Sequence, residues 1–144
     1  MKSVLISIRP KWCTKIASGE KTIEVRKSHP KLETPFKCYI YRCLEKHGDI
    51  YTTSGKVIGE FVCDDIYWAV STPKIFNRYP CYHKKAIEDA CMTMEEAEKY
   101  SGRKPLYGWH ISDLQIYDEP KELREFNLSR APMSWCYCEE SEGK

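Results

Sequence analysis

Three charged side chains that could do chemistry together stand close to one another near the start of the sequence. Lys21, Glu24 and Arg26 come shortly after Gly19. The lysine and the arginine can hold a phosphate or an oxyanion. The glutamate can accept a hydrogen bond from the exocyclic amine of a base, or it can activate a water molecule. The alternative is that Glu24 and Arg26 form an exposed ion pair, which contributes little.

Further basic residues could enlarge this site. Arg9 and Lys11 flank Pro10, and we expect them to extend the cationic rim around Lys21. A second basic group is interleaved with tyrosines and comprises Arg78, Tyr79, Tyr82, His83, Lys84 and Lys85. Such a mixture suits the backbone of single-stranded RNA, and an exposed helix start is an equally good interpretation.

Aromatic residues late in the chain are candidates for base stacking. Trp68, Tyr107 and Trp109 could each stack on a nucleobase, a contact worth about 1–3 kcal/mol. Aromatic residues at period-two spacing more often belong to the core, although Gly108 and His110 beside Trp109 would suit a pocket wall. His110 could serve as an acid or base, or it could be a partly exposed structural histidine.

The eight cysteines are predicted to be reduced. The only apolar run near the N-terminus is too short for a signal peptide, and no stretch is long enough to span a membrane, so we expect a cytoplasmic protein. The pairs Cys136 with Cys138 and Cys81 with His83 lack the spacing of a zinc site. We therefore expect no disulfide, no metal and no cofactor.

Size and charge limit the classes of protein that the chain can belong to. It has 144 residues, of which 42% are hydrophobic, enough for one core, and a net charge of +2. That charge is too small to mark a nucleic-acid binder by bulk basicity, so any contact with RNA must come from local clusters. We expect a single domain over residues 1–138, followed by a frayed acidic tail over 139–144.

Hydrophobic periodicity predicts short strands with helices between them. The expected strands cover residues 3–8, 22–26, 36–43, 57–70 and 106–117, and the expected helices cover 10–18, 83–91 and 93–102, with one further helical turn in 120–126. Residues 45–55 and 73–80 are predicted to be connections. Gly59 suggests a bulge or a close backbone approach, and a bulge near Ser112 and Asp113 would keep Leu114 and Ile116 on the core side. This order favours an α+β fold, a small mixed β-barrel of five to six strands with short peripheral helices.

Several of these segments resemble the ASCH domain family, a branch of the PUA-like barrels. The family has a strand, a short helix and a segment of the form G-x-K-x-x-E-x-R, matched here by Gly19, Lys21, Glu24 and Arg26. Segments 6–10, 55–61 and 107–111 extend the resemblance, which spans residues 3 to 117 in the expected order. It implies a PUA-like fold and a protein that binds RNA or modifies its components.

Similarity to small bacterial members implies a specific reaction as an alternative. Those enzymes remove the acetyl group from acetylated cytidine with a Lys, Thr, Glu triad. The lysine corresponds to Lys21, the threonine position holds Glu24, and the glutamate falls on Glu88. The hydroxyl nucleophile is therefore missing, and a hydrolase would need Glu24 as general base on water and Lys21 as oxyanion donor.

Two functions follow from these residues. The first is an RNA-binding or nucleotide-binding protein whose cleft contains Lys21, Glu24 and Arg26. The second is a hydrolase, either an amidohydrolase acting on an acylated nucleoside or a ribonuclease. The missing threonine favours binding.

Overall fold

The computed structural model describes residues 2–44, 54–71 and 81–139. The strands are β1 (Ser3–Ile8), β2 (Ile23–Arg26), β3 (Phe36–Arg42), β4 (Lys56–Ser71), β5 (Cys81–Tyr82), β6 (Leu106–Lys121) and β7 (Trp135–Cys138). The helices are α1 (Pro10–Ala17), α2 (Lys84–Asp89), α3 (Met94–Ser101) and the 3₁₀ turn η1 (Leu123–Phe126). Every predicted strand and helix is present within a few residues of its expected bounds. The expected connections at 45–55 and 73–80 and the acidic tail lie largely outside the described residues.

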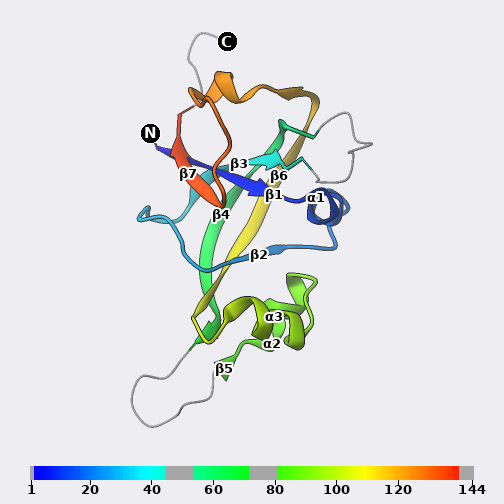
Figure 1. The fold of residues 1–144 in the computed structure, drawn as a ribbon, viewed down its shortest axis with the longest axis vertical. Helices are drawn as coiled ribbons and strands as arrows, with labels where there is room; N and C mark the ends of the chain where they lie inside the picture. The colour runs from blue at the N-terminus through cyan, green and yellow to red at the C-terminus, as the bar shows by residue number, and fades with distance from the viewer. Residues whose placement is uncertain (1, 45–53, 72–80, 140–144) are drawn as a thin grey trace.

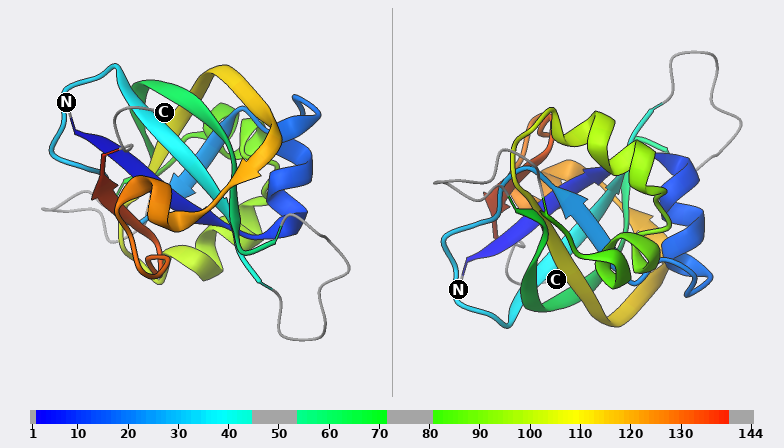
Figure 2. Two further views of the ribbon diagram at one scale, coloured as in Figure 1. Left: turned by 90° about the horizontal axis from the view of Figure 1, so that it is seen from above. Right: turned by 90° about the horizontal axis from the view of Figure 1, so that it is seen from below.

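The strands form one mixed sheet in the order β2-β6-β4-β3-β1-β7, with β5 added to β4. The two longest strands, β4 and β6, run along the long axis of the molecule (Figure 1). Seen along that axis, the strands curl around a common centre (Figure 2). The α+β class is therefore confirmed, with seven strands in the described residues in place of five or six.

A closed barrel is not confirmed. β2 and β7 stand at opposite ends of the strand order, and no backbone pairing joins the two ends in the described part of the chain. β2 has only four residues and pairs with β6 alone. The sheet thus keeps an open seam between the free edge of β2 and the far end of the strand order.

The two faces of the sheet pack against different partners. One core contains the alternate residues of β1 and β3 with Trp109, and α1 adds Cys13 and Ile16 to it. A second core lies between β2 and the helices α2 and α3, where Ile23 and Val25 meet buried alanines and Ile87. β2 therefore separates two packed regions, so its side chains are covered on both faces.

Two irregularities bend the long strands where the sequence predicted. A Cβ on Gly59 would lie 2.5 Å from the carbonyl oxygen of Gln115, so only glycine fits this close approach. The β4–β6 pairing shifts between Val62 and Glu60, and Asp113 adopts a φ of 46°, which places a bulge after Ser112.

The expectation for the residues after this bulge is only half right. Leu114 packs at the edge of the core, whereas Ile116 is 41% exposed. Ile116 lies opposite Gly59, which has no side chain to cover it.

The ends of α1 and α3 carry residue types that favour the start and the end of a helix. Pro10 occupies the first turn of α1, and the chain turns back at Gly19 with a φ of +85°. Thr93 and Glu96 cap α3 reciprocally, and Gly102 ends it in the left-handed conformation. None of the helices within the described residues is long and apolar enough to cross a membrane.

Candidate functional site

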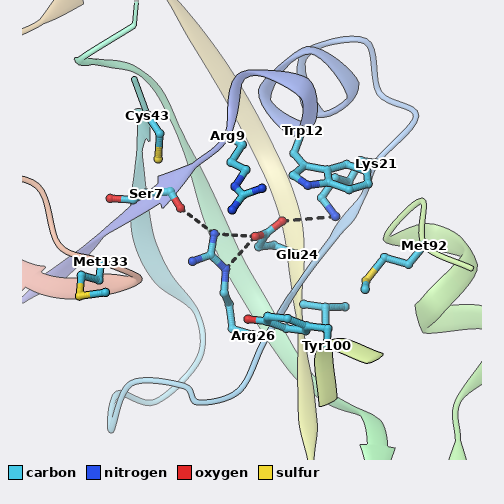
Figure 3. Close-up of a pocket in the computed structure, with 11 residues that line it drawn as sticks. Ser7, Arg9, Trp12, Lys21, Glu24, Arg26, Cys43, Met92, Tyr100 and Met133 are labelled. Carbon is cyan, nitrogen blue, oxygen red and sulfur yellow. Dashed lines mark hydrogen bonds and ion pairs between the residues drawn. The ribbon is translucent and has the colours of Figure 1, made fainter. Parts of the chain in front are cut away.

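A cavity of about 380 Å³ opens at the free edge of β2 (Figure 3). The segments that surround it are β1, α1, β2, the end of β3, the α2–α3 turn and α3. Its lining consists of Ser7, Arg9, Trp12, Lys21, Glu24, Val25, Arg26, Cys43, Met92, Tyr100 and Met133. The cavity therefore lies where the sheet fails to close.

Local structure explains how three charged side chains reach this cavity. After α1 the chain reverses at Gly19, and the amide of Lys21 donates to the carbonyl of Lys15 at 3.0 Å. β2 then begins, and its alternation directs Glu24 and Arg26 to one face. The prediction that Lys21, Glu24 and Arg26 border one concave site agrees with this geometry.

Glu24 lies at the centre of a buried ion network. Its Oε1 is 3.3 Å from Lys21 Nζ, and its Oε2 is 2.7 Å from Nη2 of Arg26 and accepts from its Nε at 2.8 Å. The Lys21 ammonium also donates to the carbonyl of Ala90 at 2.7 Å and lies 4.8 Å from the centre of the Trp12 ring. Glu24 is only 5% exposed. The alternative of an exposed ion pair is therefore wrong.

Arg26 also bridges the seam of the sheet. Its Nη2 donates to the carbonyl of Ser7 on β1 at 2.7 Å, and its Nη1 donates to Oγ of Ser134, just before β7, at 3.1 Å. Together with the contacts to Glu24, these bonds engage all three guanidinium nitrogens. The Arg26 side chain thus ties β2 to β1 and to the start of β7. Within the described residues, no backbone hydrogen bond joins β2 to either of these strands.

The network keeps Glu24 ionised. Burial raises the pKa of this carboxyl, but the charges of Arg26 and Lys21 and their hydrogen bonds outweigh burial and lower the pKa below its ordinary value. A carboxylate held in this way is a weak base. Such a network holds the charged groups of Lys21, Glu24 and Arg26 in fixed positions.

The mouth of the cavity carries a different kind of cation. Arg9 is exposed, and in the described residues its side chain makes no hydrogen bond or ion pair. Figure 3 shows its guanidinium directed toward the centre of the cavity. Arg9, Lys21 and Arg26 are positive and Glu24 is negative, so the lining carries a net formal charge of +2.

Aromatic and sulfur-containing side chains complete the lining. Trp12 and Tyr100 approach the charged network from opposite sides (Figure 3). Burial raises the pKa of the Tyr100 hydroxyl above its ordinary value. Burial also raises the pKa of the Cys43 thiol despite the nearby charges of Arg26 and Arg9. A neutral thiol is a poor nucleophile, so Cys43 is not set up for covalent chemistry.

Besides Lys11, which is described below, four other predicted site residues lie away from the cavity lining. The side chain of Glu88 is 58% exposed and its nearest ion-pair partner is Lys84 on the same helix. Trp109 is fully buried, and its Nε1 donates to the carbonyl of Ser28. Trp109 is thus a core residue.

The remaining two, Tyr107 and His110, lie on opposite faces of β6. Tyr107 packs between His29 and Trp68, with ring centres at 4.7 and 5.0 Å. His110 Nδ1 lies 2.6 Å from Oδ1 of Asp64 on the neighbouring strand. The structure therefore does not bring these residues together with Glu24.

Lys11 lies on the surface, as do His83, Lys84 and Lys85 of the second basic group. Lys11 is exposed and its ammonium lies 4.5 Å from the ring centre of Trp12, outside the cavity lining. Lys84 and Lys85 form ion pairs along α2. Arg78 and Tyr79 lie outside the described residues.

Sequence reasoning missed several residues of the cavity. Trp12 was expected only as a packing partner within its helix, and Tyr100 gave no signal. Met92 and Met133 gave none either. These residues come from segments whose position depends on tertiary packing, so no local pattern marks them.

Among the comparisons with known proteins, the one with solved structures supports this fold. No protein-family model matches the chain, and no curated protein matches it significantly. Among solved structures, an ASCH protein from Zymomonas mobilis aligns with a TM-score of 0.68 and 18% identity, over 94% of this chain and 86% of that one.

Two variants of the same Zymomonas mobilis protein give similar values. A tyrosine-to-phenylalanine form has a TM-score of 0.68 and 20% identity, covering 95% of this chain and 90% of that one. A serine-to-alanine form has a TM-score of 0.67 and 19% identity, covering 94% and 87%. The resemblance seen in the sequence is confirmed at the level of structure: the chain has the fold of this ASCH protein.

Proposed function

We propose that this protein binds a nucleotide of RNA, or a free nucleotide, in the cavity at the edge of β2. The observation that carries the proposal is the cavity itself: its lining has a net positive charge, and its Arg9 makes no hydrogen bond or ion pair within the described part of the chain. Its volume is within the range of roughly 300–1,000 Å³ usual for small-molecule sites. The resemblance to ASCH proteins points to the same class of ligand.

The division of roles in the cavity supports phosphate binding by Arg9. Most donors of Lys21 and Arg26 are directed to Glu24 and to backbone carbonyls, so these two side chains act on a ligand mainly through their charge. Arg9 retains its guanidinium for a ligand, and arginine matches the geometry of a phosphate. Tyr100 offers a ring on which a base can stack.

The same contacts favour binding over hydrolysis. A general base on water needs an accessible carboxylate with a raised pKa, whereas Glu24 is buried, has a lowered pKa and has both oxygens engaged. Two of the three donors of the Lys21 ammonium are directed to Ala90 and Glu24, which leaves at most one for an oxyanion. Glu88 lies outside the lining and does not complete a triad with them.

The proposal also covers the cellular location and the domain organisation of the protein. We propose a single ASCH-type domain over residues 1–138 that acts in the cytoplasm without metal or cofactor, with its thiols reduced.

Calorimetric titration with the four ribonucleoside 5′-monophosphates and the four parent nucleosides tests the proposal. At least one monophosphate should bind, more tightly than its nucleoside. Arg9→Ala should weaken that binding about tenfold, because a hydrogen bond to a charged group contributes about 1.5–3 kcal/mol. Lys11→Ala is the matched control, since Lys11 lies on the same helix entrance but outside the lining.

Two experimental outcomes would contradict the proposal. If no monophosphate binds, or if nucleosides bind equally well, the proposal is wrong. A mass shift on acetylated cytidine incubated with the parent chain would instead support the hydrolase.

A further inference from the structure

The free edge of β2 offers the cavity a pair of backbone hydrogen-bonding groups. β2 pairs with β6 in the register Ile23 with His110 and Val25 with Gly108. One residue earlier, the carbonyl of Thr22 accepts from the amide of Ile111 at 2.9 Å. This bond fixes which residues of the strand face their partner.

In an antiparallel pair the backbone groups of alternate residues point toward the partner strand, and those of the intervening residues point away. Because the backbone carbonyl of Thr22 faces β6, the backbone groups of Glu24 and Arg26 face β6 as well. The amide and carbonyl of Val25 therefore point to the open edge. Val25 lines the cavity, and within the described residues neither of its backbone groups hydrogen-bonds outside the sheet.

We infer that the N–H and C=O of Val25 recognise the Watson–Crick edge of an unpaired nucleobase in this cavity. This inference rests on the proposed function and specifies its substrate class. An N–H and a C=O side by side match the neighbouring donor and acceptor that every base presents on that edge. A base already paired in a duplex has no free edge, so the protein selects single-stranded RNA or a free nucleotide.

The surroundings of Val25 favour a base over a peptide strand. An extended peptide needs several consecutive backbone groups along an edge. The backbone groups of Ile23 point outward as well, but Ile23 does not line the cavity. Beyond Val25 the Arg26 side chain crosses the edge to reach Ser7, so Val25 is the outward-facing residue of β2 that borders the cavity. The rings of Trp12 and Tyr100 bound the same space and suit a planar ligand (Figure 3).

The ligand itself supplies the sharpest test, because a methyl group on the ring nitrogen blocks the edge without altering the protein. The four ribonucleoside monophosphates are compared with their ring-N-methylated forms: 3-methyl for uridine and cytidine, 1-methyl for adenosine and guanosine. For the monophosphate that binds best, methylation should weaken binding about tenfold or more, because a backbone group is left without its partner.

Amide hydrogen exchange gives a second readout in the unaltered chain. The monophosphate should slow exchange at the Val25 amide and leave Glu24, whose amide already faces β6, unchanged. Equal binding of methylated and parent nucleotides, or an unprotected Val25 amide in the complex, would overturn the inference while leaving the proposed function intact. Protection of Val25 by a valine-rich tetrapeptide, with no monophosphate binding, would overturn both.

Discussion

Two sets of opposite charges with similar spacing in the sequence end in opposite environments. Lys21 and Glu24 are three residues apart, and their side chains are 3% and 7% exposed. Lys84 and Glu88 are four residues apart on α2, and their side chains are 81% and 58% exposed. The nitrogen–oxygen distances are 3.3 and 3.9 Å.

The elements that pack over a charge pair, and not its spacing in the sequence, therefore decide whether the pair is buried. α1 brings Trp12 over Lys21, and the end of α2 brings the carbonyl of Ala90 to its ammonium. The pairs on α2 face solvent, where water screens them. Four predictions probe this contrast between the buried network at β2 and the exposed pairs on α2.

The largest effect is expected for Glu24→Gln. The substitution leaves Lys21 and Arg26 without the charge that compensates their burial, which should lower the free energy of unfolding by about 3–5 kcal/mol. Glu88→Gln, the matched change on α2, should stay within about 0.5 kcal/mol of the parent chain. Urea unfolding at neutral pH measures both. Equal losses in the two variants would show that the network at β2 is no more stabilising than a surface pair.

Acid should weaken the parent chain through Glu24 itself. Its pKa is lowered in the folded state from an ordinary value of 4.5, so the folded state binds this proton less readily than the unfolded state. The stabilisation is therefore complete above about pH 4.5 and is lost as the pH falls through the lower folded pKa. A carbon-detected NMR titration of Glu24 should give a midpoint below 4.5. A midpoint above that value would contradict the ion network.

A smaller effect, on binding and not on folding, is expected at Tyr100. Tyr100→Leu should weaken nucleotide binding by about 1–3 kcal/mol through lost stacking. Tyr100→Phe keeps the ring and should bind like the parent chain. Because Tyr100 is 38% exposed, neither change should alter stability much. Equal loss of binding in the phenylalanine and leucine forms would assign the role to the hydroxyl instead.

The smallest effect is expected on α2. Lys84→Ala and Lys85→Ala remove exposed ion pairs with Glu88 and Asp89, each worth about 0.3–0.5 kcal/mol. Thermal unfolding at low and high salt should show a difference from the parent only at low salt. Nucleotide affinity should not change. A clear loss of affinity would place the ligand on the basic group at α2.

Much of the fold could be predicted because its signals are local. Gly19, the reciprocal cap of Thr93 with Glu96, and the glycine at 102 each act within one turn of chain. The alternation in β2 correctly placed Glu24 and Arg26 on one face. These features depend on residues only a few positions apart.

The burial of Glu24 could not be predicted in the same way. It depends on Arg26 reaching Ser7 and Ser134, which are 19 and 108 residues away in the sequence. The open seam could not be predicted either, because β2 is joined to β1 through the Arg26 side chain and not through strand pairing. Tyr100 enters the cavity only because α3 packs beside β2. Periodicity contains no information about such distant contacts.

The central claim is that a nucleotide binds in the cavity at the edge of β2. Mapping of amide chemical shifts on titration with the best-binding ribonucleoside monophosphate tests it most directly. The claim predicts changes concentrated at Arg9, Val25 and Tyr100, with Tyr107 and His110 unaffected. Changes concentrated at Tyr107 and Trp68, with Arg9 and Val25 unmoved, would contradict it.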